Sequence, residues 1–235
     1  MHLFRMPPRG NNIAAMSWAE DMNDGSTSRS DVLRASPPMF ESRLLDALSR
    51  VHPLVPVLIF GPLIVALAAW GFSLVSAPAA LALLLGGYAF WTLFEYWLHR
   101  LVFHFEPEQG VGARLHWIIH GVHHDHPNDP LRLVMPPAVS VPLAALLFGL
   151  FYVLFGHRYA PGVAVGFYAG YLAYDMTHYY LHHFRPRGPL GRWLRERHMR
   201  HHFQDETRGF GISAPYWDDI FGTSSGSARG EPRRK

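Results

Sequence analysis

The sequence predicts an all-α integral membrane protein with a metal site at one end of its helices. Four stretches of 21 or 22 residues contain one charged residue or none, and each is long enough to cross a membrane. Ten of the 16 histidines gather in four tight clusters that lie at or beyond the ends of these stretches. The stretches are residues 54–75, 77–98, 136–156 and 160–181.

The four stretches are expected to form two helical hairpins. At 1.5 Å per residue each gives about 33 Å of helix, against a hydrocarbon core of roughly 30 Å. Pro56, Pro62 and Pro142 do not contradict this reading, because membrane helices tolerate proline. Short turns near residues 76–78 and 156–158 close the two hairpins.

The distribution of lysine and arginine orients the hairpins. Of the 21 such residues, only Arg158 lies on the side of the two turns. The positive-inside rule therefore places both termini and every histidine cluster in the cytoplasm. The net charge of +3 is attributed to arginines that face anionic lipid headgroups. Nucleic acid is not an expected partner, because no basic stripe alternates with aromatic residues and no zinc-finger or helix-turn-helix spacing occurs.

The histidines have the spacing of residues that share one face of a helix. Residues three and four apart lie together on a helix surface, so His120 is expected to meet His123 and His124. His99 and His104 are five apart and do not keep one helical face, so His99 is expected on the last turn of a helix and His104 just beyond it. The expected metal ligands are His99, His104, His120, His123, His124, His178, His182, His198, His201 and His202.

Ten imidazoles are more than one four-coordinate ion needs, which favours a site for two metals. A single such cluster is as often structural as metal-binding, but four of them within about a hundred residues favour metal binding. Imidazole suits zinc, copper, iron and nickel alike, so the spacing leaves the metal open. Glu95 and Asp175, which precede His99 and His178, are expected to support ligand histidines, a common position for carboxylates in metal sites.

The other histidines are not expected to be ligands. His52 and His157 stand alone and are expected to be satisfied core residues. His116, His126 and His183 lie near the clusters without fitting their spacing, so they are expected to support ligands or to lie at the surface.

Composition excludes several other kinds of site. The absence of cysteine rules out disulfides, thiolate-ligated haem and iron–sulfur clusters. No glycine-rich dinucleotide loop and no Walker A sequence occurs. Residues 1–49 are expected to be a mostly disordered tail without the apolar core of a secretory signal, residues 50–223 the folded domain, and residues 224–235 a second disordered tail.

The clusters and their flanks form longer motifs, which lie in residues 95–104, 120–137, 174–183, 198–203, 209–213 and 217–223. Among these are Glu-Tyr-Trp-Leu-His-Arg-Leu-Val-Phe-His in the first and Gly-Phe-Gly-Ile-Ser in the fifth. Read together over residues 50–223, they resemble the fatty acid 2-hydroxylases of the membrane fatty acid hydroxylase and sterol desaturase superfamily. The histidine pair inside the fourth apolar stretch favours this branch over the acyl-CoA desaturases.

The resemblance implies a cytosolic helical cap over a dimetal centre that holds two iron ions, with zinc as the substitute in purified protein. It also implies hydroxylation at carbon 2 of a long-chain fatty acyl group, free or in ceramide, with dioxygen and two electrons. Asp175, Tyr174 and Tyr179 are the expected catalytic residues. Arg132 and Asn128 are further candidates, with the two tyrosines, for holding the polar head of the substrate.

The resemblance also bears on electron supply and location. Many eukaryotic members carry an N-terminal cytochrome b5 domain, and the tail before residue 50 is too short for one. An external donor of the ferredoxin or cytochrome b5 type is therefore expected, docked on Arg187, Arg192, Arg195 and Arg197. The lipid bilayer is the other expected partner, as bacterial inner membrane or endoplasmic reticulum.

The sequence leaves two alternative functions open. A sterol or carotenoid hydroxylase or desaturase of the same superfamily would keep the metal site and change the product. A metal transporter or zinc-storage protein would need ionisable residues near the bilayer midplane, whereas here they crowd one end of the apolar stretches.

Overall fold

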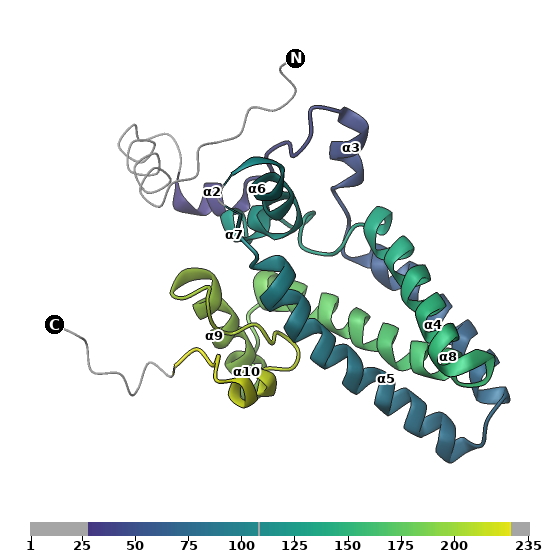
Figure 1. Cartoon of the computed structure of the whole chain (residues 1–235). Coiled ribbons are helices and arrows are strands. Elements are labelled where there is room, and N and C mark those ends of the chain that lie inside the picture. The colour runs from purple at the N-terminus through teal and green to yellow at the C-terminus, as the bar shows by residue number, and fades with distance from the viewer. Residues whose placement is uncertain (1–27, 108, 227–235) are drawn as a thin grey trace.

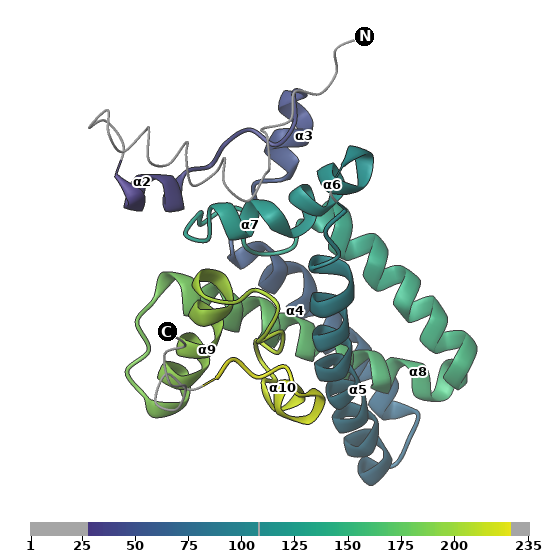
Figure 2. The same ribbon diagram turned by 60° about the vertical axis from the view of Figure 1, so that its left-hand side comes forward.

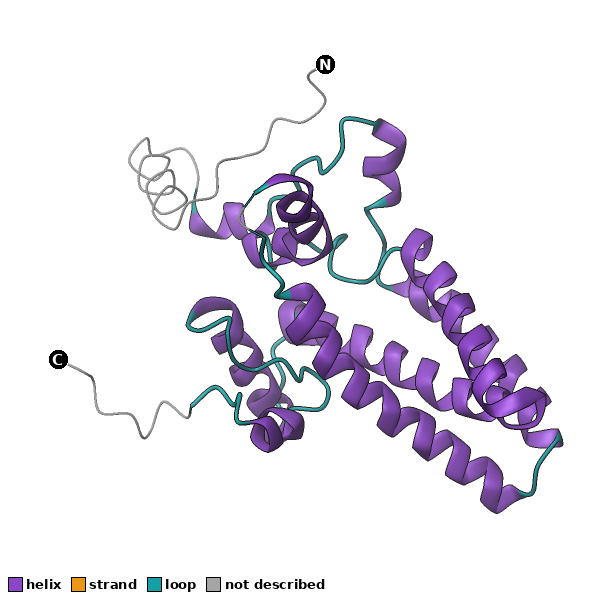
Figure 3. Ribbon diagram, in the orientation of Figure 1, coloured by secondary structure: helices purple, strands orange, loops and turns teal. Residues whose placement is uncertain are grey.

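The computed structural model describes residues 28–107 and 109–226. Within them every regular element is a helix, which confirms the all-α prediction (Figure 3). The elements in chain order are α2 (Arg29–Arg34), α3 (Arg43–Leu48), α4 (Leu54–Ser73), α5 (Ala77–Leu98), the π-helix η1 (His99–Phe103), α6 (Gly110–His116), the π-helix η2 (Trp117–Gly121), α7 (Val122–Asp125), α8 (Pro137–His183), α9 (Pro189–Phe203) and α10 (Tyr216–Phe221).

Three long helical segments are apolar enough to cross a membrane. They are α4, α5 with its continuation to Phe103, and α8. Many of their large apolar side chains point away from the protein: Leu58 is 71% exposed, Val65 68% and Leu146 70%. Apolar surface of this extent is typical of helices that are covered by lipid.

The longest of these segments, α8, has 47 residues and contains a break at Gly156. Gly156 has φ 69° and ψ 172°, a conformation that only glycine adopts readily. The arms on either side, residues 137–155 and 157–183, are about 28 and 40 Å long, and Figure 1 shows α8 changing direction between them. The break lies at the turn predicted for residues 156–158. Four separate membrane-spanning helices stay a prediction, because the described residues form three helical segments that are long and apolar enough to cross a membrane.

Close packing of α5 against α8 depends on glycine. A Cβ atom at Gly87 would lie 2.1 Å from the Val163 carbonyl oxygen, and one at Gly166 would collide with the α5 backbone. Small residues of this kind let membrane helices approach each other. Nearby, the rings of Trp91 and Phe167 meet edge to face with centroids 5.1 Å apart. The packing brings the carboxyl ends of α5 and α8, which carry histidines, to the same end of the molecule.

The short helices gather at that end. Figures 1 and 2 show α6, α7, α9 and α10 around the ends of α5 and α8, with α2 and α3 beyond α6 and α7. This arrangement corresponds to a helical cap over the ends of the long helices.

Part of the predicted N-terminal tail is folded onto the cap. Residues 28–49 contain α2 and α3. Arg132 donates to the Asp46 carboxylate at 2.8 Å and to the Pro37 carbonyl, and its buried guanidinium needs these acceptors. Apart from residues 224–226, the remainder of the two predicted tails lies outside the described residues.

Candidate metal centre

The ten predicted ligands lie together in two groups of five. In each group one potential ligand atom per residue lies within 4.8 Å of all the others. The first histidine cluster consists of His99, His104, His120, His124 and His201. The second histidine cluster consists of His123, His178, His182, His198 and His202. The clusters are neighbours, because the rings of His124 and His202, one from each, have centroids 4.3 Å apart.

A π-helical turn brings His99 and His104 together. Beyond Leu98, α5 continues as η1, and the His104 backbone N–H donates to the His99 carbonyl five residues earlier, at 3.1 Å. This wider turn places residues five apart on one face, whereas an α-helix would separate them. The predicted position of His104 just beyond the helix is confirmed, but the prediction that this pair does not keep one helical face was wrong, since it assumed α-helical geometry.

The second and fourth histidine motifs each serve both clusters. In α9, His198 and His202 belong to the second cluster and His201 to the first. At about 100° per residue, positions four apart point only about 40° from each other, while positions 201 and 202 diverge by about 100°. His120, His123 and His124 divide in the same way. The prediction that each motif presents a single ligand face is thus corrected. Both α9 and α7 contribute histidines to the first and to the second cluster.

The ring nitrogens of the first cluster face one another. The Nε2 atom of His99 lies 3.2 Å from those of His104 and His120, and the Nε2 atoms of His120 and His124 are 3.0 Å apart. His99 and His201 also place Nδ1 2.7 Å from the backbone carbonyls of residues 210 and 208. Because a carbonyl only accepts, Nδ1 carries the proton in both rings, and Nε2 turns an unprotonated lone pair toward the cluster centre.

The second cluster has the same character. The Nε2 atom of His198 lies 2.7 Å from that of His182 and 3.1 Å from that of His202. The Nε2 atoms of His123 and His178 are buried and have no hydrogen-bond partner among the described residues. Buried polar atoms without a partner are costly, and a cation between converging lone pairs would satisfy them. Both clusters therefore fit a metal ion bound by nitrogen alone, at the usual distance of about 2.0–2.1 Å.

Burial keeps these imidazoles neutral. Desolvation, reinforced by neighbouring histidines, lowers the pKa of His104 and of His123 to about 3. Desolvation lowers the pKa of His201 to about 4 although the Arg208 carbonyl opposes it, and the pKa values of His198 and His202 are lowered well below 6.5. At neutral pH the rings therefore hold free lone pairs and need lose no proton to bind a metal.

The loop of residues 208–213 sets the tautomers of His99 and His201 in the first cluster, and two buried carboxylates hold it. The Asp218 carboxylate accepts from the N–H groups of Phe210 and Gly211, each at 2.9 Å. The Glu95 carboxylate accepts from the N–H groups of Ile212 and Ser213, each at 2.8 Å. Burial raises the pKa of Asp218, and these N–H donors oppose the rise.

Glu95 thus acts on His99 through this loop and not by direct contact. Asp218 was not predicted as a functional residue, although it lies in the motif of residues 217–223. The available signal was the Gly-Phe-Gly-Ile-Ser segment, whose loop-forming backbone N–H groups need acceptors once they are buried.

The three predicted catalytic residues are placed differently. Tyr174 is buried, with its ring 5.7 Å from that of His178. Asp175 is 2% exposed and lies beside the Tyr171 hydroxyl, and within the described residues it has no hydrogen bond to a ligand histidine. The Tyr179 ring packs on His183, which belongs to neither cluster, with centroids 4.3 Å apart.

The structure also locates the histidines outside the two clusters and the predicted substrate contact Arg132. His116 is buried 3.7 Å from the Glu106 carboxylate, and His126 contacts the Val32 carbonyl. His52 and His157 are exposed, so their prediction as core residues was wrong. Arg132 is held by α3 in the salt bridge described above, which leaves it unsuited to bind the head of a substrate.

Comparison with known proteins agrees with this geometry. Residues 84–223 match the model of the fatty acid hydroxylase family. A dihydroceramide fatty acyl 2-hydroxylase of Arabidopsis thaliana is 43% identical over 136 residues, which cover 58% of this chain and 57% of that protein. The fatty acid 2-hydroxylase of Homo sapiens is 41% identical over 140 residues, which cover 57% of this chain and 37% of that protein.

A solved structure extends the similarity to the fold. The structure of full-length scs7p, in which only the hydroxylase domain is visible, is 34% identical with a TM-score of 0.76, and the match covers 80% of this chain and 72% of that one. The matched region spans less than two thirds of the curated relatives named above.

Proposed function

The chain belongs to the fatty acid hydroxylase family, and from that membership we propose that it hydroxylates carbon 2 of long-chain fatty acids or of the N-acyl chain of ceramide. The observation that carries the proposal is the pair of neighbouring clusters in which ten imidazoles, seven of them buried, bring potential ligand nitrogens together. Two iron ions bound there would supply the activation of dioxygen that an unactivated C–H bond requires.

The protein's own residues prepare the site in three ways. The hydrogen bonds from Nδ1 of His99 and His201 to backbone carbonyls fix which nitrogen faces the metal. Seven of the ten imidazoles are buried, which limits the access of water to them. Between α4, α5 and α8 lies a narrow apolar cleft, lined by aromatic residues such as Phe60 and Trp91, against which a lipid chain is proposed to lie.

Product analysis tests the function. Membranes that contain the chain, supplied with dioxygen, a ferredoxin or cytochrome b5 and its reductase, are expected to convert palmitate or N-palmitoyl sphingosine to the 2-hydroxy product. Mass spectrometry locates the added oxygen. Leaving out the donor is expected to stop turnover, because the described residues include no electron carrier. Oxygen found at another carbon or on a sterol would contradict the proposal.

Asp175 is proposed to act beside the metals and not as a ligand. Asp175→Asn is expected to keep both metal ions and to lower the rate of product formation by roughly 10- to 100-fold, the usual range for groups that support a metal site. Elemental analysis and rate measurement on the same preparation check this. Metal loss as large as that of His178→Ala would make Asp175 a ligand.

The proposed topology has the turns outside and the histidine clusters in the cytoplasm. The chain has no cysteine, so single introduced cysteines report accessibility without background. Ser76→Cys and His157→Cys, both at exposed positions, are expected to react with an impermeant maleimide added to intact cells. Gln204→Cys, exposed beside the second cluster, is expected to react only after permeabilisation. The reverse pattern would mean the opposite orientation.

The electron donor is proposed to dock on the basic face of α9 and the loop before it. Arg187 and Arg192 are exposed there, while Arg197 is partly engaged with Asp219 at 3.3 Å. Exposed cations of this kind attract an acidic partner and are screened by salt. Turnover supported by the donor is accordingly expected to fall as ionic strength rises.

A further inference from the structure

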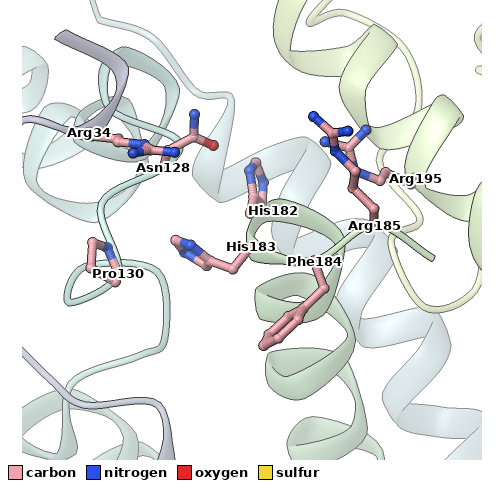
Figure 4. A pocket seen from close by; sticks show the side chains of 8 residues that line it. All are labelled: Arg34, Asn128, Pro130, His182, His183, Phe184, Arg185 and Arg195. Carbon is pink, nitrogen blue, oxygen red and sulfur yellow. The ribbon is translucent and has the colours of Figure 1, made fainter. Parts of the chain in front are cut away.

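A polar pocket opens beside the second histidine cluster, between α2 and the loop after α7 on one side and the start of α9 on the other. Its volume is about 500 Å³. His182, a member of the second cluster, also lines the pocket. The pocket therefore adjoins the proposed metal position through the His182 side chain. Figure 4 shows Arg34 and Asn128 on one side of the pocket, Arg185 and Arg195 on the other, and His182 between them.

The pocket is positively charged. Three arginines line it and no acidic residue does. Within the part of the chain that the structure describes, none of the three guanidinium groups has a carboxylate within 4.0 Å. Arg195 is held in place by a hydrogen bond of 2.9 Å from its Nε to the Leu181 carbonyl, which leaves its two terminal nitrogens for another partner.

Guanidinium groups that line one cavity without a carboxylate partner favour an anion. Arginine matches the geometry of a carboxylate or a phosphate, and the charge-assisted hydrogen bonds that result are about twice as strong as neutral ones. The amide of a ceramide carries no charge and would form no charge-assisted hydrogen bond with these arginines. The lining therefore favours a substrate with an anionic head.

The chemistry of the proposed reaction indicates which anion. Carbon 2 of a fatty acid is bonded to the carboxyl carbon, so an enzyme that hydroxylates carbon 2 must hold the carboxylate next to its metals. We propose that Arg34, Arg185 and Arg195 bind the carboxylate of a free long-chain fatty acid and thereby place carbon 2 at the second cluster. This inference rests on the proposed function and names the substrate class and the residues that set the position of attack.

Binding of chain-matched probes tests the proposal without turnover. Metal-loaded protein in phosphatidylcholine nanodiscs is to be titrated with palmitate and with its uncharged methyl ester. In the double variant Arg34→Gln/Arg185→Gln, palmitate is expected to bind at least about 10-fold more weakly, since the loss of even one of the two charge-assisted bonds contributes about that much. The methyl ester is expected to bind equally to both proteins. Arg195 is left intact because it holds the end of α8.

Arg187→Gln is the matched control. Arg187 is exposed, two residues from Arg185 and outside the pocket lining, and the substitution removes one of the two positive charges that the double variant loses. Unchanged palmitate affinity in the control, with loss in the double variant, supports the proposal. Equal palmitate affinity in all three proteins would overturn it, as would an equal loss for palmitate and methyl ester.

Two further outcomes separate this inference from other sources of binding. If phosphatidic acid in the nanodiscs displaces palmitate from the wild-type protein and not from the double variant, the pocket holds a lipid phosphate and the proposal fails. Charge-dependent palmitate binding without any 2-hydroxy product would overturn the proposed function alone. A 2-hydroxy product with charge-independent binding would overturn only the assignment of the arginines.

Discussion

Replacing His182 with alanine is expected to remove one of two bound metal ions and to abolish product formation. The wild-type protein, purified after iron supplementation, is expected to hold two ions per chain, one in each histidine cluster. His182 lies in the second cluster, with Nε2 2.7 Å from that of His198, so its loss opens that site. Elemental analysis is expected to fall from two ions to one in the variant.

The same substitution at three positions makes the experiment specific. His99→Ala removes a member of the first cluster and is expected to leave the ion of the second. His157→Ala changes an exposed histidine at the turn in α8 and is expected to keep both ions and full activity. Metal binding also contributes to folding, so both ligand variants are expected to unfold at a lower temperature. One ion or none in the wild-type protein would refute the two-metal site.

The set of residues in the two clusters was predictable because helical spacing is local information. The motif of His198, His201 and His202, for example, places its side chains within about one helical turn, wherever that helix lies in the fold. Which histidine belongs to which cluster was not predictable, since this depends on how α7 and α9 are oriented relative to α5 and α8. The π-helical turn that joins His99 to His104 was also missed, because spacing alone does not reveal a shift to five-residue hydrogen bonds.

Contacts between distant segments account for the other differences. Arg132 was a candidate for the head of the substrate, yet it is paired with Asp46, 86 residues earlier in the chain. Glu95 was expected beside His99 because it lies one helical turn before it, whereas its carboxylate holds Ile212 and Ser213. Sequence proximity suggested His99 for Glu95, and the family resemblance suggested the substrate for Arg132. The tertiary fold supplied a different partner in each case.

Asp218 is the residue whose importance follows from the structure alone. Its carboxylate accepts from the N–H groups of Phe210 and Gly211 and from the Thr223 hydroxyl, and it is fully buried. The carbonyl of the same Phe210 lies 2.7 Å from Nδ1 of His99. A chain of contacts therefore links this carboxylate to the first cluster, with the loop between them.

Asp218→Ala is expected to destabilise the protein by roughly 2–6 kcal/mol, because it leaves two buried N–H groups without an acceptor at about 1–3 kcal/mol each. The loosened loop no longer fixes the tautomer of His99, so the first cluster is expected to lose its ion while the second keeps its own. Thermal unfolding and elemental analysis of the same preparation check the two effects. Asp218→Asn, which retains one acceptor oxygen, is expected to lie between the wild type and alanine.

The neighbouring residue provides the control for this experiment. Asp219 has a side chain that is 57% exposed and contacts Arg197 at 3.3 Å, and such surface pairs contribute about 0–1 kcal/mol. Asp219→Ala is therefore expected to keep both ions and to change stability little, although it removes the same charge one position along the helix. If Asp218→Ala behaved like Asp219→Ala, the loop of residues 208–213 would not depend on this carboxylate, and His99 would be oriented by the metal itself.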